Sequence, residues 1–408
     1  MQIGIGFSRQ TSSLQAGQEA ASLASQLQPK SPQLVLAFCN HALNPQDVYL
    51  GIRAVVGAEI PIIGGSAIGI IGNDCLITEG PAVVVASLSS HHIRCHHGHA
   101  NGLFKDPLQT GRQLGEQLAQ VPLPPQLMLL LYDSIRYPAG KFAPAVLNPS
   151  NLLLQGLAES TLEVPMLAGA GLLGDHRFQS SWQFTGFDVA RHHAVALLLS
   201  GPVASVQAVM HGCTPVATRR YRISSIHGQF LYQLDGRPAL QVIDEALGGN
   251  HWRAQAPIRE LCLGRRLQTD DKLQPQYLNR LISGILPEQD GLVLFEDDLA
   301  EGDEVLLMRR APELALQAAA EQTAALLAGI NQSGQQPLLA LYINCGGRAV
   351  PNEQAETREI QRQLNQANIP LLGFYSGVEL APIQGQTRGL DWSGVLTILC
   401  RSKPCLSV

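Results

Sequence analysis

Charged residues are scarce in this chain, and neither sign dominates. Asp, Glu, Lys and Arg make up only 15% of its 408 residues, and the formal net charge is −5. Proteins that bind nucleic acid neutralise phosphates with clustered Lys and Arg, so we expect no nucleic-acid partner. Hydrophobic residues account for 45% of the chain, which excludes a disordered or strongly solvating chain. We therefore expect a compact, globular protein.

Long hydrophobic runs are also absent. No segment approaches the roughly 20 apolar residues that are needed to cross a bilayer, and residues 1–20 have no basic region followed by an unbroken apolar stretch. We therefore expect a cytoplasmic protein without membrane insertion. The eight cysteines include no Cys-x-x-Cys pair, and several lie inside apolar runs, which favours reduced thiols.

Signatures of common enzyme classes are missing as well. The sequence has no Gly-x-Ser-x-Gly elbow, no Walker loop and no His-Glu-x-x-His motif. Residues 169–174 match the glycine pattern of dinucleotide-binding loops. However, the residues that follow do not read as a helix whose N-terminus could hold a pyrophosphate. The sequence therefore predicts a protein that is not an enzyme.

What the sequence does contain is an internal repeat. In each copy an apolar run precedes a proline-initiated helix, an Ile-Pro or Val-Pro dipeptide then opens a glycine-containing apolar run, and a third apolar run follows. The helix-starting and strand-starting prolines are equally spaced in the first two copies, Pro45 with Pro61 and Pro149 with Pro165. Such repetition indicates duplicated β-α-β-β units. The first runs of the three copies are residues 34–38, 127–131 and 338–342, and the last are 82–86, 194–198 and 395–399.

The apolar runs do not alternate with polar residues, which is typical of strands that are buried on both faces. Asn44 before Pro45, Asn148 before Pro149, and Pro351 mark helix starts. We predict an α/β protein in which repeated β-α-β-β units form layered sheets flanked by helices, in two lobes. A first domain over residues 1–220 would hold two units. A second domain over residues 221–408 would hold one clear unit with additional strands and helices.

An acidic segment lies between two strands predicted at residues 291–295 and 305–308. It contains Glu296, Asp297 and Asp298, followed by further carboxylates up to Glu304. Acidic runs usually meet water, so we predict a solvated hairpin turn and not a metal site. An Ala- and Leu-rich helix is predicted from Pro312 to residue 327, ending at Gly329.

Glycine-rich segments follow the second strand of each copy, at residues 64–66, 169–171 and 373–377. Glycine permits tight turns or the close approach of another backbone or a ligand. Loops at the carboxyl ends of strands are where α/β proteins bind small molecules. Strand-end turns and bulges that bind nothing are the alternative.

The loop after the first strand of the third copy, residues 344–348, is the partner of these turns. Arg348 follows two glycines there and could hold a carboxylate with paired hydrogen bonds, or could instead lie on a helix-rich surface. Cys345 in the same loop is either a nucleophile, if its pKa is lowered, or a buried structural thiol.

Histidine is concentrated after the third strand of the first copy, where His91, His92, His96, His97 and His99 surround Cys95. In extended structure His91, Cys95 and His97 share one face. They could ligate a transition metal or give haem an axial ligand, or form only a polar edge. His176, beside Asp175, is a second candidate haem ligand.

In combination these segments resemble the FIST family of tandem N- and C-terminal sensory domains. Residues 235–240 look like that family's junction between the two halves. Residues 342–348 and 369–380 look like the distinctive part of its C-terminal half, and residues 169–175 are similar to the N-terminal half. The resemblance covers nearly the whole chain. Ile71 and His176 stand where the family often has acidic residues.

The resemblance implies a sensor of small ligands, with amino acids among the ligands proposed. It also implies that some two-domain members bind haem, sense nitric oxide and regulate a partner histidine kinase. No kinase or helix-turn-helix segment is visible in this sequence, so we expect the signal to pass to another protein.

The leading hypothesis is a non-enzymatic, small-ligand-binding sensory protein of bacterial signal transduction that acts through a separate partner. Glu379 would accept from a ligand amine and Arg348 would hold its carboxylate. The alternatives are a haem-binding nitric-oxide sensor, with His176 or the set His91, Cys95 and His97 as ligands, and a thiol-dependent enzyme that uses Cys345. The predicted ligand-binding residues are Ser66, Asp175, Asn344, Cys345, Gly346, Arg348, Gly373, Phe374, Tyr375, Ser376 and Glu379.

Overall fold

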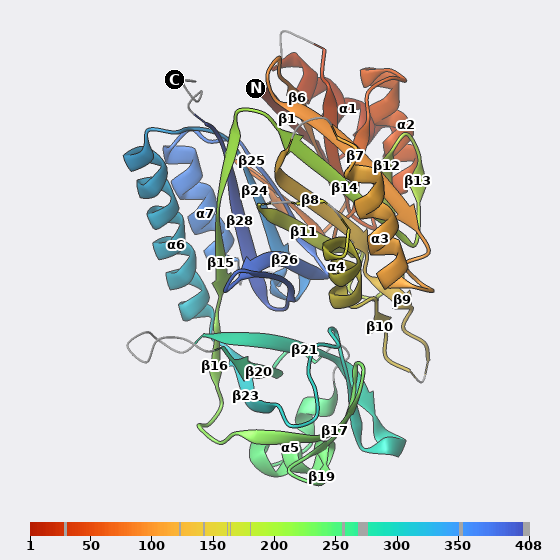
Figure 1. Cartoon of the computed structure of the whole chain (residues 1–408), viewed down its shortest axis with the longest axis vertical. Coiled ribbons are helices and arrows are strands. Elements are labelled where there is room, and N and C mark those ends of the chain that lie inside the picture. Colours follow the sequence, from red (N-terminus) through yellow and green to blue (C-terminus); the bar gives the residue numbers. More distant parts are fainter. Residues whose placement is uncertain are drawn as a thin grey trace.

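The computed structural model describes residues 1–27, 31–121, 124–141, 143–160, 162–163, 165–179, 181–254, 258–267, 276–350 and 354–402. The chain folds into two lobes (Figure 1). The large lobe contains three six-stranded sheets with helices on their outer faces, and we call it the ring. The small lobe, residues 213–310, is built mainly of strands. The predicted α/β architecture of repeated, layered units in two lobes is confirmed.

The ring consists of three units of similar order. The first contains β1 (Gln2–Ser8), α1 (Ser13–Gln26), β2 (Leu34–Cys39), α2 (Pro45–Val56), β3 (Ile62–Ser66), β4 (Gly69–Gly72), β5 (Leu76–Ile77) and β6 (Val83–Ser89). The second contains β7 (Arg94–Asn101), α3 (Pro107–Leu118), β8 (Pro125–Asp133), β9 (Ile135–Tyr137), β10 (Val146–Leu147), α4 (Ser150–Ala158), β11 (Leu167–Leu172), β12 (Gln183–Gly186), β13 (Val189–Ala190) and β14 (His193–Ser200).

The third unit is interrupted by the small lobe. Its elements are β15 (Val203–His211), α6 (Pro312–Ser333), β24 (Gln336–Cys345), η3 (Gly346–Arg348), α7 (Ala355–Gln366), β25 (Leu371–Ser376), β26 (Val378–Ile383), β27 (Gln386–Leu390) and β28 (Ser393–Arg401). Figure 1 shows β15 running from the ring into the small lobe. The predicted β-α-β-β segment is therefore the inner part of a longer unit that begins with one more strand and helix.

The small lobe is a barrel. Its elements are β16 (Cys213–Pro215), β17 (Tyr221–His227), β18 (Phe230–Leu234), β19 (Arg237–Pro238), α5 (Ala239–Leu247), η1 (His251–Ala254), β20 (Cys262–Arg266), β21 (Tyr277–Leu286), η2 (Pro287–Gln289), β22 (Gly291–Leu294) and β23 (Glu304–Arg310). The strand order β23-β17-β18-β22-β21-β20 closes because β20 also pairs with β23. Closure leaves few free sheet edges.

The three units exchange hairpins around the ring. The β4–β5 hairpin of the first unit pairs with β25 of the third, the β26–β27 hairpin of the third pairs with β11 of the second, and the β12–β13 hairpin of the second pairs with β3 of the first. Each sheet is thus completed by a neighbouring unit. The units cannot separate without breaking three sheets.

The exchange also explains why the central strands are apolar along their whole length. In β2, Val35, Ala37 and Cys39 pack under α1 and α2. Leu36 and Phe38 face a core that they share with β8, β11, β24 and β25. The Phe38 and Phe374 rings stack there at a centroid distance of 3.9 Å. Both faces of this central strand are therefore buried, as the unbroken runs predict.

The predicted helix boundaries are partly correct. Asn44 caps α2 by accepting from the backbone N–H groups of Gln46 and Asp47, as predicted. Asn148 does not cap α4, because its side chain donates to the carbonyls of Asp133 and Ile135. The helix predicted to stop at Gly329 continues to Ser333 and ends at Gly334, because helix formers on both sides carry the chain past one glycine. Pro351 lies outside the described residues.

Among the described residues, every helix is too short or too polar to cross a bilayer.

Candidate functional site

The ends of the strands β3, β11 and β25, one from each unit, lie next to one another. Backbone N–H groups of Ile68, Gly377 and Ser66 donate to the carbonyl oxygens of Tyr375, Gly171 and Trp182, at 2.9, 2.8 and 2.9 Å. Each of these hydrogen bonds joins one unit to another. The glycine-rich segments at residues 64–66, 169–171 and 373–376 are not turns after the strands but parts of β3, β11 and β25 themselves. The ends of these strands bring the units into close contact, which is the close approach of backbones that the glycines permit.

A small central cavity lies beside these strand ends. It is lined by Ile68 of the first unit, Leu173 and His176 of the second, Gly346 and Ser376 of the third, and by residues of the small lobe such as Arg259 and Phe295. Its volume is about 30 Å³, which is the room that about one water molecule occupies. An amino acid does not fit into this space.

Arg348 is engaged in a buried ion pair. Its Nε lies 2.7 Å from Oε1 of Glu356, and its Nη1 donates to the carbonyl oxygen of Met210 at 3.0 Å. Asn344 donates to Thr357 Oγ1 at 3.2 Å on the same side of the sheet. These contacts join β15, η3 and α7. Arg348 therefore stabilises the packing of β15, η3 and α7 within the third unit.

Glu379 is fully buried on β26 and accepts from Ser376 Oγ at 2.9 Å. Burial and the nearby Asp391 raise the pKa of this carboxyl well above its usual range. The prediction that Arg348 and Glu379 bind the same ligand requires that both line one cavity. Arg348 instead borders a separate space of about 10 Å³, and neither residue lines the central cavity. The structure thus does not bring this pair together around a ligand.

The other predicted residues have structural contacts. Gly373, Phe374 and Tyr375 lie in the buried strand β25, where the Tyr375 hydroxyl is 3.2 Å from Thr357 Oγ1. Ser66 Oγ accepts from the backbone N–H of Trp182 at 3.0 Å. Asp175 Oδ1 accepts from the N–H groups of Arg177 and Gln179 and so closes the turn after β11. Only Cys345, Gly346 and Ser376 of the predicted ligand-binding set line the central cavity.

The histidines do not form a metal centre. His91 lies in a bend before β7, while Cys95 and His97 lie on that strand, half-buried, with His97 against the ring of Phe187. Within the described residues no three His, Cys, Asp or Glu side chains come together as metal ligands. His176 borders the central cavity, whose volume of about 30 Å³ leaves no room for a porphyrin. The surroundings of His176 therefore do not fit haem.

Cys345 lines the central cavity but is almost fully buried. Burial and the neighbouring Glu379 and Asp391 carboxyl groups raise the pKa of its thiol well above the usual range. The thiolate is the reactive form of cysteine, so the environment suppresses nucleophilic chemistry at this position.

We expect iodoacetamide to modify Cys345 in the native protein near neutral pH at less than about one-tenth of the rate for a free cysteine, because little thiolate is present and access is restricted. Peptide mass spectrometry over time measures this rate. The unfolded protein, in which Cys345 should react fully, is the control. Fast and selective labelling of native Cys345 would contradict this expectation and support the hypothesis of a thiol-dependent enzyme.

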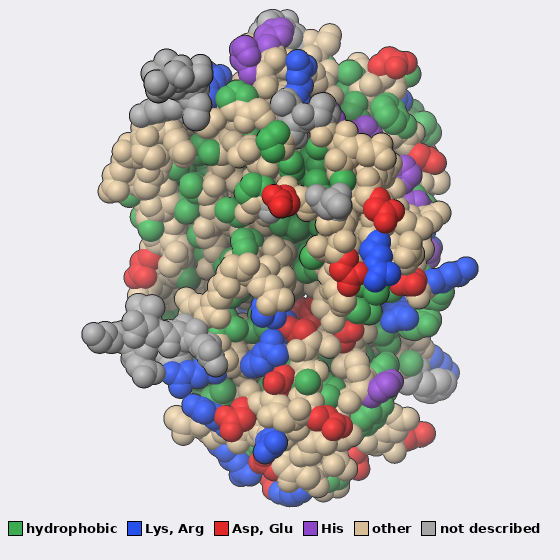
Figure 2. Space-filling view, in the orientation of Figure 1, with side chains coloured by type: hydrophobic (Ala, Val, Ile, Leu, Met, Phe, Trp, Pro, Cys, Tyr) green, Lys and Arg blue, Asp and Glu red, His purple; other side chains and the backbone are tan. Residues whose placement is uncertain are grey.

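A larger cleft separates the two lobes, and we call it the interlobe cleft. Its volume is about 660 Å³, which lies in the roughly 300–1,000 Å³ range of small-molecule sites. The ring contributes α4 and residues 385–389, and the small lobe contributes β21 and the segment after β22. In Figure 2 acidic and basic side chains gather at the level between the lobes. The polar lining residues are Ser150, Asn151, Gln155, Arg280, Glu296, Asp298, Gln386, Thr387 and Arg388.

Glu296 joins the two walls of this cleft. Its side chain is 1% exposed, and Oε2 accepts from both the backbone N–H and Oγ of Ser150, at 2.9 Å each, at the start of α4. Its Oε1 is buried and has no hydrogen-bond partner in the described structure. Burial raises the pKa of this carboxyl well above its usual range.

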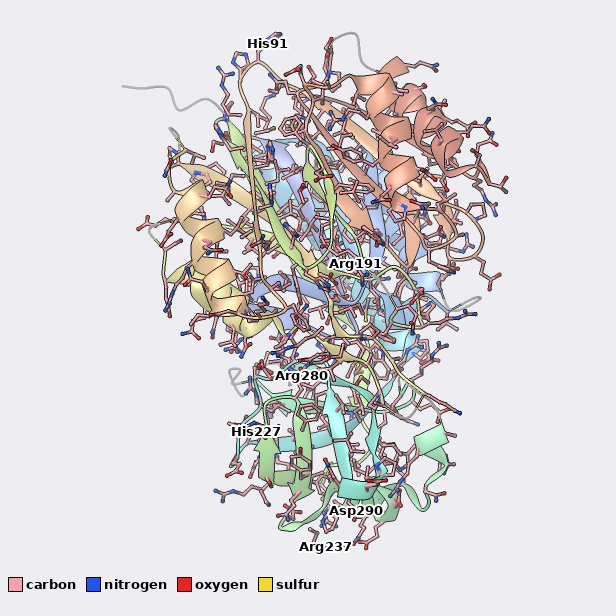
Figure 3. All side chains as sticks on the ribbon, turned by 90° about the vertical axis from the view of Figure 1, so that its right-hand side faces the viewer. His91, Arg191, His227, Arg237, Arg280 and Asp290 are labelled. Atoms are coloured by element: carbon pink, nitrogen blue, oxygen red, sulfur yellow. The ribbon has the colours of Figure 1, made fainter. Side chains whose placement is uncertain are left out.

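Arg280 lies at the junction of the lobes (Figure 3). It is 1% exposed, and its Nε and Nη2 each donate to the Asp298 carboxylate at 2.6 Å. The prediction of a solvated acidic turn is therefore wrong for Glu296 and Asp298. Arg280 of β21, 18 residues away in the chain, donates to Asp298, and Ser150 of α4, 146 residues away, donates to Glu296. The one local signal was a carboxyl group two residues after the end of the buried strand β22.

Family comparison gives this geometry a context. The model of the FIST N domain matches residues 33–237, and the model of the FIST C domain matches residues 239–382. The chain belongs to the FIST family. The two FIST matches meet inside the small lobe, at the strand β19, so the interlobe cleft takes α4 from the FIST N domain and Arg280, Glu296 and Asp298 from the FIST C domain.

Solved structures with low similarity to this FIST protein include a cyanuric acid hydrolase from A. caulinodans, with 9% identity over 98% of this chain and 99% of the other and a TM-score of 0.32. A chorismatase has 11% identity over 98% of both chains and a TM-score of 0.34. Likeness at this level transfers neither fold nor activity. No curated protein matches the chain significantly.

Proposed function

We propose that this FIST protein is a non-enzymatic sensor that binds a small polar ligand in the interlobe cleft. The observation that supports this most directly is the ligand-sized space of about 660 Å³ in which polar side chains of both lobes face each other. A ligand that contacts both lobes favours the arrangement in which both sets of contacts form. Ligand binding in the cleft then changes the relative arrangement of the two lobes, and with it the surface that a partner protein contacts.

FIST domains are sensory domains of signal transduction proteins, which agrees with this role. We further propose that the protein acts in the bacterial cytoplasm through a separate partner. The family resemblance implies a histidine kinase as the class of partner. It also implies amino acids among the possible ligands. The suppressed reactivity of Cys345 supports a role without covalent catalysis.

The proposal predicts that filling the cleft abolishes ligand binding. Ala158 is an exposed residue of α4 that lines the cleft, so Ala158→Trp should occupy the space without disturbing the core. A library of amino acids and other small polar metabolites is first screened for compounds that raise the melting temperature of the wild-type protein. Each such compound should bind Ala158→Trp at least about tenfold more weakly than it binds the wild type. Calorimetry measures the affinity.

Ala325→Trp is the matched control, because Ala325 is an exposed helical alanine of α6 outside the cleft. It should bind each compound as the wild type does. If no library compound binds, or if every compound that binds does so equally well to Ala158→Trp, the interlobe cleft is not the sensory site.

A further inference from the structure

The strand β27 has one unpaired edge beside the interlobe cleft. It is the last strand of its six-stranded sheet, where it pairs with β26 and with no other described strand. Residues 385–389, which comprise the end of the preceding turn and most of β27, line the cleft. Figure 1 shows the hairpin of β26 and β27 at the end of the ring that faces the small lobe. An open sheet edge of the ring therefore borders the ligand-sized space.

The turn of this hairpin fixes the hydrogen-bond pattern of β27. The two-residue turn consists of Gln384 and Gly385, which both have a positive φ. In such a hairpin the pair of residues next to the turn exchanges both hydrogen bonds of the ladder, and every second pair along the strands does the same. Here that pair is Ile383 with Gln386. Arg388, two residues further on, therefore bonds to β26 as well.

Thr387 and Gly389 lie at the intermediate positions. Their backbone N–H and C=O groups therefore point away from β26, towards the open edge. Pro382, which has no N–H to donate, lies opposite Thr387, which agrees with this alternation. The backbone groups of Thr387 and Gly389 have no hydrogen-bond partner among the described residues. The edge thus offers donors and acceptors that a further strand could pair with.

The other two exchanged hairpins lack a comparable edge. Their outer strands, β5 and β13, contain two residues each, whereas β27 contains five. At about 3.4 Å per residue, β27 is about 17 Å long. An extended peptide of about four residues can lie along it.

The charged residues of the cleft balance one another. The lining contains two basic and two acidic side chains, those of Arg280, Arg388, Glu296 and Asp298. Arg280 and Asp298 are already joined by two hydrogen bonds of 2.6 Å. The cleft therefore has no surplus charge that would require an ionic ligand, and a neutral peptide backbone suits it.

The helix α4 supplies an apolar wall on one face of β27. A Cβ atom at Gly389 would lie 2.4 Å from Ser150 Oγ, so this face of the strand is directed at α4. Side chains of a strand point alternately to the two faces of its sheet, and every second side chain of an added strand would therefore contact this wall. The apolar residues of the wall are Leu154, Leu157, Ala158, Leu162 and Leu167.

We propose that the interlobe cleft binds a short extended peptide, which adds to the open edge of β27 through the backbone of Thr387 and Gly389 and has apolar side chains at alternate positions. This inference rests on the proposed function and names the ligand class. Main-chain hydrogen bonds supply affinity in such strand addition, and alternate side chains supply selectivity. Thr387 and Gly389 are about 7 Å apart along the strand, so a single amino acid cannot pair with both.

Capped peptides test the ligand class. Acetylated and amidated tetrapeptides of Ala, Val, Leu, Ser and Thr are small polar ligands and are added to the library that is screened by melting temperature. At least one should bind. In calorimetry the tightest tetrapeptide should bind at least about tenfold more tightly than the acetylated and amidated single residues that it contains, because these form fewer hydrogen bonds with the edge.

Methylation of alternate peptide amides gives a signature of strand pairing. Every second N–H of an added strand points to β27, and the others point away from it. Two versions of the tightest tetrapeptide are compared, each methylated at one of the two alternating sets of amides. One version should bind at least about tenfold more weakly than the parent peptide, and the other should differ from it by less than about threefold.

A proline at position 387 tests the protein side of the pairing. Thr387→Pro removes the N–H that points to the open edge and leaves the ladder with β26 intact, and proline is tolerated on the open side of an edge strand. It should weaken binding of the tightest tetrapeptide at least about fivefold. Thr387→Val keeps the N–H and a branched side chain, and should bind this peptide within about twofold of the wild type. If Thr387→Pro does not fold, the methylated peptides still decide the question with the wild-type protein.

Several results would overturn the inference. They are no binding by any tetrapeptide, equally tight binding by the capped single residues, equal effects of the two methylation patterns, and wild-type affinity in a folded Thr387→Pro. Peptide binding that Ala158→Trp leaves intact would place the peptide outside the cleft and would overturn it too. None of these results removes the proposed sensor, which is supported by any library compound whose binding Ala158→Trp abolishes.

Discussion

Replacing Gly65 by alanine is expected to destabilise the protein by about 3 kcal/mol or more, or to prevent it from folding. Gly65 lies on β3, where the β12–β13 hairpin of the second unit joins the first sheet. A Cβ atom there would lie 2.0 Å from the carbonyl oxygen of Trp182, and the backbone φ of +144° favours glycine. Neither backbone can move away without breaking the ladder between β3 and β12. Urea denaturation followed by circular dichroism measures the loss.

Gly329→Ala is the control for this substitution. Gly329 lies within α6, has no heavy atom within 4 Å of its added Cβ position, and has no positive φ. Alanine should therefore leave stability unchanged or increase it by up to about 1 kcal/mol, through helix propensity and lower chain entropy. If Gly65→Ala were as stable as the wild type, the close approach of the exchanged hairpin would be incorrect.

Removing the charge of Arg348 is expected to lower the free energy of unfolding by about 3–5 kcal/mol, because it leaves the Glu356 carboxylate buried without its partner. The side chains of Arg348 and Glu356 are only 4% and 7% exposed. Arg348→Met keeps a long apolar side chain and removes the charge. Thermal and urea unfolding should both show the loss.

Two further variants identify its cause. Arg348→Met combined with Glu356→Gln should recover about half or more of the lost stability, since no buried charge is left unpaired. Arg362→Met removes the cation of the Arg362–Glu359 pair on the exposed side of α7, where Arg362 is 53% exposed, and should change stability by no more than about 0.5 kcal/mol. Equal losses in Arg348→Met and Arg362→Met would contradict a structural role specific to Arg348.

The sequence predicted much of the ring. The proline and apolar signals located β2, α2 and β3 and their counterparts in the other units, because these elements depend on local hydrophobic pattern and capping. The additional strand and helix of the first two units were not recognised, and of the third unit's additional pair only the helix α6 was predicted. The strand β7, for example, is rich in histidine, and only alternate positions near its end are buried. The two lobes were expected, but the insertion of the small lobe between β15 and α6 was not.

The candidate site was harder to predict. Cys345, Gly346 and Ser376 do lie where the three units meet, as the repeat suggested, but the space there is filled by the neighbouring hairpins and by the small lobe. The residues of the interlobe cleft were assigned to a solvated turn or not noticed. Glu296 and Ser150 are 146 residues apart in the chain, so no local pattern indicates that they are in contact.

By itself, the sequence determined the secondary structure of the three repeated cores and the burial of their strands, since both follow from side chains that are close together in the chain. Only the tertiary structure decided which unit receives each hairpin, which carboxylates are buried and where a ligand-sized space remains. These features depend on the packing of segments that are not neighbours in the chain, where shape and the pairing of buried polar groups select the arrangement.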